Sequence, residues 1–271
     1  MEKTFIKRGT VKDQMHRTIE VNKPLKRIVS IVPSQSELLW DLGLEKELVG
    51  ITKFCIHPKD KFKCTTKIGG TKKINIQKII DLKPDLIIGN KEENDKQQIE
   101  ELMQYFPVWM SDIYNLSDAL EMIKNVGDIV GKKNEALQIA QQAQTNFKLL
   151  TKEISVNSKK KALYFIWKDP FMLAGKNTFI DEMLTYCNLE NEINLSRYPK
   201  LDLEELDLFN PDIVLLSTEP YPFKENHIKE FNTIWPKAII KLVDGEMFSW
   251  YGSRLLKSAQ YFRYLITKTE F

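Results

Sequence analysis

The sequence has few of the residue types that usually carry catalysis or staple a fold with disulfides. It contains three histidines and three cysteines among 271 residues, and an odd cysteine count does not form a fully paired disulfide framework. It lacks the G-x-S-x-G, Walker A, G-x-G-x-x-G and H-E-x-x-H motifs, and no histidine stands beside a plausible nucleophile in the sequence. General-base catalysis by histidine is therefore poorly supported, and we expect no enzyme, no catalytic residue and no resident cofactor.

Long apolar runs and a strong excess of one charge are also missing. No window approaches the roughly 18 consecutive apolar residues of a membrane-spanning helix. The first nine residues lack the apolar core of a signal peptide, so we expect either a mature exported form or a cytoplasmic protein. The net charge is only +3 and lysines are interleaved with acidic residues, so the sequence indicates no nucleic-acid partner.

What the chain does have is a duplicated stretch. Residues 82–93 and residues 209–219 each contain a Pro-Asp pair, an unbroken apolar run, a small polar turn and an acidic residue. Proline disfavours helix in the residue before it, and a continuous apolar run bounded by turn signals is typical of a strand buried on both faces of a parallel sheet. The pattern therefore predicts the same βαβ unit twice, and so two α/β lobes. Helical patterns flank the two copies at 74–81, 95–105, 203–208 and 225–231.

A long helical pattern without proline or glycine separates the two copies, over residues 132–154. It is either an ordinary domain helix or a stiff connector that fixes the distance between the lobes. We accordingly expect an N-terminal lobe over 1–131, a connecting helix over 132–156 and a C-terminal lobe over 157–271. Further expected features are a strand at 27–32, a helix begun by a capping box of Ser34 and Glu37, an amphipathic helix at 116–130 and a loop at 244–254.

Four short segments carry a family resemblance. They are Arg-Ile-Val-Ser-Ile-Val-Pro-Ser at 27–34, Val-Gly-Ile-Thr at 49–52, Ile-Gly-Gly-Thr at 68–71 and Leu-Lys-Pro-Asp-Leu at 82–86. In this order they resemble the helical-backbone (class III) periplasmic binding proteins, the substrate-binding components of ABC importers for cobalamin, ferric siderophores and haem. The resemblance implies two Rossmann-like α/β lobes with parallel sheets, joined by one long rigid α-helix, with a ligand cleft between the lobes.

The resemblance also implies a function and a place of work. It implies a monomer that captures a metal chelate and delivers it to an ABC permease, in the periplasm or anchored to the membrane. The loops at 53–58 and 246–254 are similar to those of the cobalamin-binding branch, so a corrinoid is the first expectation, and a ferric siderophore or haem the next. The alternative is a cytoplasmic enzyme or sensor without a leader that handles metal complexes on the same scaffold, because a fold alone does not fix function.

Candidate ligand contacts lie in the loops that follow the predicted strands, because ligands of open parallel sheets bind outside the carboxyl ends of the strands. Aromatic residues gather in these loops, and Trp and Tyr combine a rigid surface with a polar group, which suits a flat, partly polar ligand such as a macrocycle. The helix N-terminus after the strand at 27–32 adds free N–H groups. Any single aromatic residue among them could equally belong to the core. The predicted ligand-binding residues are Ser34, Phe54, Asn90, Trp167, Phe171, Tyr198, Tyr221, Phe248, Trp250 and Tyr251.

Acidic residues after the two Pro-Asp strands are the candidates for partner docking. The resemblance implies one acidic residue on each lobe that docks onto arginines of the permease. The matching positions are Glu92 or Glu93 in the first lobe and Glu219 or Glu225 in the second. These glutamates would also complement the dipole of a following helix, and the two roles are compatible.

One loop contains three soft metal-ligand types, Cys55, His57 and Cys64. Their C-x-H-x6-C spacing differs from the usual zinc patterns, and no fourth ligand stands near them in the sequence. We therefore expect a structural loop and predict no metal site. Whether Cys55 and Cys64 pair as a disulfide is left open.

Overall fold

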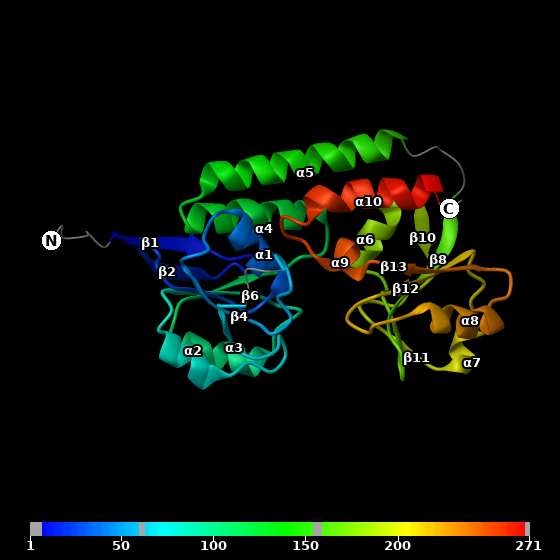
Figure 1. The fold of residues 1–271 in the computed structure, drawn as a ribbon, viewed down its shortest axis with the longest axis horizontal. Coiled ribbons are helices and arrows are strands. Elements are labelled where there is room, and N and C mark those ends of the chain that lie inside the picture. The colour runs from blue at the N-terminus through cyan, green and yellow to red at the C-terminus, as the bar shows by residue number, and fades with distance from the viewer. Residues whose placement is uncertain (1–6, 60–62, 154–158, 269–271) are drawn as a thin grey trace. The chain divides into compact units, whose positions relative to one another are not determined.

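The computed structural model describes residues 7–59, 63–153 and 159–268 (Figure 1). It divides into two compact units. Unit 1 contains the described residues up to Ile113, together with Ser117–Gln142 and the short segment Tyr251–Arg254. Unit 2 contains Tyr114–Leu116, the described residues from Ala143 to Trp250, and those from Leu255 onward. The C-terminal part of the chain therefore contributes a short segment to the unit built mainly from the N-terminal half.

Unit 1 is built on a parallel sheet whose described strands run in the order β5-β4-β3-β6-β7. The central strand β6 is buried at every position, as its unbroken apolar run predicts for a strand covered on both faces. A separate antiparallel hairpin, β1 and β2, precedes the sheet. The strands are β1 (Lys7–Lys12), β2 (Thr18–Lys23), β3 (Ile28–Ser30), β4 (Leu48–Ile51), β5 (Thr66–Lys67), β6 (Leu86–Asn90) and β7 (Val108–Ser111).

Helices cover both faces of this sheet, and Figure 1 shows α2 and α3 on the side opposite α4. Ile79 of α2 and Ile99 and Leu102 of α3 form one apolar cluster with Val29 and Ile87 of the sheet. Alternate residues of the strands therefore face these two helices. The helices are α1 (Pro33–Asp41), α2 (Ile76–Leu82), α3 (Lys96–Met103) and α4 (Leu116–Ile129).

Helix α1 begins by a different device from the predicted one. Pro33 is its first residue, and the N-cap is Val32, which makes no side-chain capping hydrogen bond. Ser34 lies inside the first turn and Glu37 pairs with Arg254, so the predicted capping box of Ser34 and Glu37 is wrong. Proline is well suited to a first helical position because its missing N–H would have no partner there and its φ is already helical.

Helix α5 (Lys133–Glu153) is continuous over 21 residues, which confirms the predicted long helix. The division between the units falls within it, after Gln142. Ala136, Ala140, Phe147 and Leu150 are buried, so one stripe of the helix is apolar along its length. No helix in the described part of the chain is both long and apolar enough to span a membrane.

Unit 2 has a mixed sheet whose described strands run in the order β11-β9-β8-β12-β13, with β10 also paired to β8. β8, β10, β12 and β13 are parallel, which agrees with the prediction from the repeat. β9 turns back antiparallel to β8, and β11 pairs antiparallel with β9. The strands are β8 (Lys160–Trp167), β9 (Phe171–Leu173), β10 (Leu189–Asn191), β11 (Lys200–Leu201), β12 (Ile213–Ser217) and β13 (Ile239–Val243).

The core of unit 2 is rich in aromatic residues. Phe165 on the sheet packs edge-on against Phe231 of α8 with ring centroids 4.7 Å apart, and Trp235 lies beside both. Residues 245–249, which were expected to be a loop, form the short helix α9 because Asp244 accepts a hydrogen bond from the Glu246 N–H and caps it. The helices are α6 (Phe179–Tyr186), α7 (Leu203–Leu206), α8 (Glu225–Ile234), α9 (Gly245–Ser249) and α10 (Leu255–Lys268).

The aspartate of each repeated Pro-Asp pair ties two neighbouring strands together. In unit 1 Asp85 precedes β6, and its Oδ2 accepts the backbone N–H groups of Lys26 (2.7 Å) and Arg27 (2.9 Å), which lead into β3. In unit 2 Asp212 precedes β12, and its Oδ2 accepts the N–H of Lys161 in β8 at 2.8 Å. The repeat in the sequence is therefore a repeat of the same hydrogen-bonding device.

Candidate ligand-binding site

Buried polar side chains line the carboxyl edge of the unit 1 sheet. β3, β6 and β7 end at Ser30, Asn90 and Ser111, each at most 1% exposed. Ser111 Oγ accepts hydrogen bonds from Gln35 Nε2 (2.6 Å) and Asn90 Nδ2 (3.0 Å) and donates to the Gly89 carbonyl oxygen (3.2 Å). These bonds connect α1, β6 and β7 at the edge where a ligand of such a sheet would bind.

Asn90, one of the predicted ligand residues, shapes the turn that follows β6. Its Oδ1 accepts the backbone N–H groups of Glu92 (2.8 Å) and Glu93 (3.0 Å). Asn94 Oδ1 in turn accepts the Asn90 N–H at 2.8 Å. Asn90 is itself buried, so its side chain fixes where Glu92 and Glu93, both partly exposed, are presented.

Segment 251–254 packs on the N-terminus of α1 within unit 1. A Cβ added to Gly252 would lie 2.5 Å from the Ser34 carbonyl oxygen, so only glycine permits this approach. The neighbouring Tyr251 hydroxyl donates to Glu93 Oε1 at 2.5 Å. Burial, followed by the nearby Glu93 carboxylate, raises the pKa of Tyr251 well above its usual value, which keeps it a neutral donor. Ser34 and Tyr251, both predicted ligand residues, are at most 6% exposed.

Two further contacts hold segment 251–254 in place. Arg254 Nε and Nη2 donate to the two carboxylate oxygens of Glu37 at 2.9 and 2.7 Å, and both side chains are buried. Ser253 Oγ donates to Asp41 Oδ2 at 2.5 Å. Sequence reasoning missed this ion pair because its partners are 217 residues apart. The available signal in the sequence was a glutamate directly before the apolar run Leu38-Leu39-Trp40.

Phe54 is the exposed aromatic residue of the unit 1 edge. It follows β4, and half of its surface (50%) is accessible to solvent. Lys53 Nζ lies 5.0 Å from the centroid of the Phe54 ring. The other side of the ring lies against Gly70, where an added Cβ would approach Phe54 Cε2 to 3.1 Å. The ring therefore rests on the glycine turn, and half of its surface stays open to solvent, where a ligand could stack.

The cysteines of the neighbouring loop are separate free thiols. Cys55 is buried, and its Sγ donates to Ser36 Oγ at 3.2 Å, whereas Cys64 is exposed. Burial raises the pKa of the Cys55 thiol. Among the described residues, no three His, Cys, Asp or Glu side chains gather as candidate metal ligands. Residues 60–62 of this loop lie outside the described part of the chain.

Trp167 and Tyr221 form an exposed aromatic pair at the carboxyl edge of the unit 2 sheet. Trp167 ends β8 with 39% of its surface exposed, and its ring centroid lies 5.5 Å from that of Tyr221. Beside the pair, Lys168 Nζ donates to Glu230 Oε2 at 2.6 Å, and this hydrogen bond raises the pKa of Lys168. The structure thus brings together two residues that are 54 positions apart and were both predicted to bind ligand.

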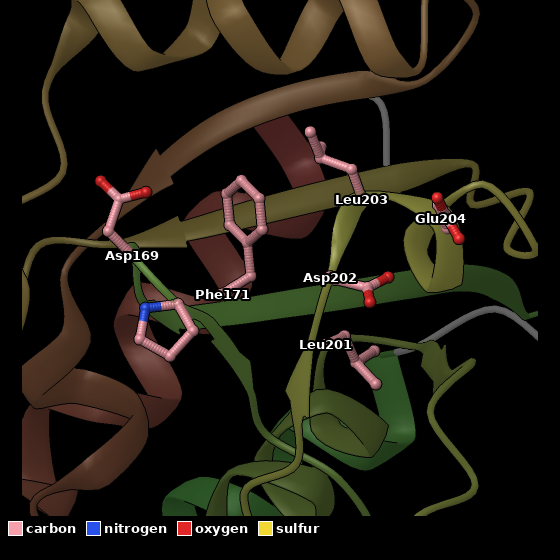
Figure 2. A pocket seen from close by; sticks show the side chains of 7 residues that line it. Asp169, Phe171, Leu201, Asp202, Leu203 and Glu204 are labelled. Carbon is pink, nitrogen blue, oxygen red and sulfur yellow. The ribbon is translucent and has the colours of Figure 1, made fainter.

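Phe171 lines a shallow pocket of about 430 Å³ in unit 2. Figure 2 shows its ring among acidic side chains that belong to the loop before β9 and to the start of α7. Within the unit, the same ring packs edge-on against Phe165 and Phe231, so only part of it faces the pocket. The lining residues are Asp169, Pro170, Phe171, Leu201, Asp202, Leu203 and Glu204.

Phe248 and Trp250 lie inside unit 2 rather than on its surface. Phe248 is fully buried, with its ring centroid 5.1 Å from that of Tyr164 and 4.7 Å from that of Phe262. Trp250 is 6% exposed and donates a side-chain hydrogen bond to Glu219. Both residues therefore belong to the packed interior of unit 2.

Glu219, a candidate docking residue, is held in an acidic and largely buried place after β12. Its Oε1 accepts a hydrogen bond from Ser249 Oγ at 2.6 Å. Burial raises the pKa of Glu219 to about 7, and the carboxylates of Glu246 and Asp244 act in the same direction. Glu219 is thus a carboxyl group that titrates near neutral pH.

The last two predicted residues lie nearer the surface. Tyr198 is partly exposed and follows Arg197, whose guanidinium carbon lies 5.3 Å from the centroid of the Tyr114 ring. Glu225 is exposed and is the first residue of α8, where its charge complements the helix dipole.

Of the ten predicted ligand residues, five are at least partly exposed and five are buried. The exposed group is Phe54, Trp167, Phe171, Tyr198 and Tyr221, and the buried group is Ser34, Asn90, Phe248, Trp250 and Tyr251.

Comparison with known proteins places this architecture. A family profile described as periplasmic binding protein matches residues 28–237. An ABC transporter substrate-binding lipoprotein of Bacillus subtilis is 26% identical over 223 residues, which are 79% of this chain and 70% of that protein. A vitamin B12-binding protein of Vibrio vulnificus is 25% identical over 206 residues, 75% of this chain and 74% of that protein.

Solved structures share the fold at lower identity. The periplasmic vitamin B12-binding protein of Vibrio cholerae superposes with a TM-score of 0.76 at 19% identity, over 89% of this chain and 97% of that one. A periplasmic haem-binding protein from Pseudomonas aeruginosa superposes with a TM-score of 0.76 at 20% identity, over 90% of this chain and 94% of that one. These likenesses confirm the predicted fold class.

Proposed function

The chain belongs to the periplasmic binding protein family, and from this premise we propose that it is the substrate-binding component of an ABC importer for a metal chelate. The observation that carries the proposal is the duplicated unit inside the matched residues 28–237. In each unit, parallel strands end at loops that expose aromatic rings, Phe54 after β4 in unit 1 and Trp167 at the end of β8 in unit 2. Relatives named as vitamin B12-binding proteins make a corrinoid the first candidate ligand, followed by a ferric siderophore or haem.

In this proposal the ten predicted residues divide into two roles. The exposed group, Phe54, Trp167, Phe171, Tyr198 and Tyr221, contacts the ligand with rigid aromatic surface. The buried group holds the loops in place, as Asn90 does through the backbone of Glu92 and Glu93. A flat chelate would gain affinity chiefly from apolar area covered by the rings, while polar groups set its orientation.

Retention of a coloured ligand tests the proposal. The purified protein is mixed separately with cyanocobalamin, haem and a ferric siderophore, desalted, and measured by absorbance and by thermal unfolding. We expect one chelate to remain bound and to raise Tm, because a ligand that binds only the folded state stabilises it. Trp167→Ala is the matched variant and should retain less. If none of the chelates is retained or shifts Tm, the proposed function is wrong.

Delivery to a permease is the second part of the proposal, with the protein working outside the cytoplasmic membrane as a monomer. Glu225 is the most accessible of the candidate docking residues, whereas Glu93 and Glu219 accept hydrogen bonds from Tyr251 and Ser249. Charge pairs at a transient interface mainly set orientation and association rate. Stimulation of permease ATPase activity should fall on Glu225→Lys and stay unchanged on the nearby exposed substitution Asn232→Lys. Equal activity of both variants would remove Glu225 from the docking surface.

A further inference from the structure

The positive charge of the chain is concentrated in one stretch. Residues 51–80 contain eight lysines and a single acidic residue, Asp60. The whole chain carries a net charge of only +3, so the remainder is net acidic. The composition alone suggests that positive and negative charges are evenly mixed along the chain. The lysines of this stretch depart from that even distribution. The stretch is of interest because it supplies the loops after β4 and β5, at the carboxyl edge of the unit 1 sheet.

Several of these lysines are drawn to one place by backbone contacts. The Lys53 N–H donates to the Gly69 carbonyl oxygen at 2.7 Å, and the Gly70 N–H donates to the Lys73 carbonyl oxygen at 2.9 Å. The half-exposed Phe54 ring rests on Gly70, with Lys53 Nζ near its face. Lys72 lies in the same turn, between Gly70 and Lys73. We call the surface made by Lys53, Phe54, Gly70, Lys72 and Lys73 the lysine edge.

In the described part of the chain, no carboxylate forms an ion pair with the lysines of the lysine edge. Lys53, Lys72 and Lys73 are exposed, and within the described ranges none of them forms an ion pair. Lys72 Nζ instead donates to two backbone carbonyl oxygens, of Glu92 (2.6 Å) and Asn94 (3.4 Å). This contrasts with Lys91 in the same unit, whose Nζ lies 2.6 Å from Asp112 Oδ2. The lysine edge thus keeps its positive charge available.

An aromatic ring beside unpaired ammonium groups selects for a particular kind of ligand. The ring offers a stacking surface for a flat group, and the ammonium groups attract oxygens of negative charge. A neutral planar ligand would use the ring but would leave the charges in place without compensation, so it would gain less. Electrostatic complementarity of this kind also speeds encounter with an oppositely charged ligand and is sensitive to salt.

We propose that the ligand of this protein is an anionic metal chelate, bound with its carboxylate or catecholate oxygens against the lysine edge. The inference rests on the proposed function and narrows its ligand class: it favours chelates with free anionic oxygens over a neutral corrinoid. Two sources share this chemistry, a porphyrin with free carboxylates and an iron complex of catecholates. The porphyrin combines a flat aromatic macrocycle with free carboxylates at its periphery, whereas the iron tris-catecholate is an octahedral trianion whose iron-bound oxygens carry the negative charge and whose aromatic rings point outward.

Pairs of probes that differ mainly in charge test the proposal. The first pair is haem and its dimethyl ester, the second is cyanocobalamin and its monocarboxylic acid, and an iron(III) tris-catecholate is measured alongside. Dissociation constants are obtained from quenching of tryptophan fluorescence at 50 and 500 mM NaCl. We expect the anionic member of the preferred pair, or the catecholate, to bind at least about tenfold more tightly at low salt, and the preference to shrink at high salt.

Variants connect the preference to the lysine edge. The double substitution Lys53→Gln/Lys73→Gln should weaken the anionic probe roughly threefold to tenfold and flatten its salt dependence, with little effect on the neutral member. The control Lys229→Gln/Lys257→Gln removes two exposed lysines of unit 2 and should change neither. Tm of each free variant verifies folding. If a neutral probe binds as tightly as its anionic partner and the lysine variants bind like wild type, the inference is overturned while the proposed function stands. If no chelate of either charge binds, both are overturned.

Discussion

At Glu219 the fold removes most of a carboxyl group from water and places it beside two further acidic side chains, Asp244 and Glu246. Its pKa rises to about 7 because the charged form loses hydration and meets like charges, although Ser249 and Trp250 donate hydrogen bonds to it. The unfolded chain has the ordinary pKa near 4.5. The folded state therefore binds this proton more tightly, and the stability it contributes is present below pH 4.5 and lost as pH rises through 7.

Glu219→Gln should therefore flatten the pH dependence of stability. The amide keeps an oxygen for Ser249 Oγ but cannot ionise, so the variant gains stability relative to wild type between pH 5 and pH 8, by up to about 3 kcal/mol. Urea unfolding at several pH values in this window measures the difference. Glu121→Gln, at an exposed glutamate in the middle of α4, is the control and should follow wild type. Parallel curves for Glu219→Gln and wild type would show that Glu219 ionises freely.

Arg254 and Glu37 present the opposite electrostatic situation, a buried charge pair with two hydrogen bonds. Arg254→Met leaves the Glu37 carboxylate buried without its cation, so we expect a loss of about 3–5 kcal/mol in the free energy of unfolding. The double variant Glu37→Leu/Arg254→Met removes both charges and should recover most of that loss. Urea unfolding of the single and double variants decides the matter. A double variant as unstable as Arg254→Met would mean that shape, not charge pairing, holds segment 251–254.

Among the elements, the starts of the central strands depend on the repeated aspartate. Asp85→Ala removes the acceptor of two backbone N–H groups before β3, and we expect a cost of about 1–2 kcal/mol. Asp212→Ala should cost a similar amount in unit 2, since it accepts the Lys161 N–H. Glu121→Ala, at an exposed position of α4, is the control and should be within about 0.5 kcal/mol of wild type. Chemical denaturation measures the free energy of unfolding of all three variants. If Asp85→Ala is as stable as wild type, the aspartate of the Pro-Asp pair does not stabilise the start of β3.

The elements that the sequence predicts well are those whose evidence is local. The apolar runs of β6 and β12 and the unbroken apolar stripe of α5 each lie within a short window, and all three elements are present. The start of α1 was predicted wrongly because Ser34 and Glu37 have capping-box spacing, while the actual partner of Glu37 is Arg254, far along the chain. Competition between a local and a distant partner cannot be judged from spacing alone.

The sequence predicted which loops form the candidate site, but it did not predict which side chains of these loops are exposed to solvent. Strand ends are visible in the sequence, and the residues after them lie at the sheet edges as expected. Phe54 and Phe248 illustrate the difference, because both were expected in loops after strands. Phe54 is half exposed, whereas Phe248 is fully buried and packs against Tyr164 and Phe262. The lysine-rich stretch at 51–80 can be read from the sequence, but the net charge of the whole chain, only +3, gives no sign of it.

At the scale of the whole molecule, α5 runs from one unit into the other, and each unit has its own sheet and core. The division between the units falls inside this helix, next to exposed polar positions such as Gln138 and Gln144. A helix without proline or glycine resists bending, because each backbone N–H is already bonded along the axis. If α5 is a stiff connector, its continuity should matter for ligand binding and not only for stability.

Glycine substitutions on either side of the division separate these two roles. Gln138→Gly/Gln144→Gly removes no buried side chain, and Gln138→Ala/Gln144→Ala is the matched control that preserves the helix. Relative to this control, each glycine destabilises the helix by about 1 kcal/mol. We expect the glycine pair to be less stable than the alanine pair by about 2 kcal/mol. We also expect it to bind the chelate more weakly than this loss of stability explains, since a flexible connector must be ordered again on binding. Ligand titration and thermal unfolding of both pairs give the answer. Lower stability with an unchanged dissociation constant would identify α5 as an ordinary domain helix, because its stiffness would then contribute nothing to how the ligand is held.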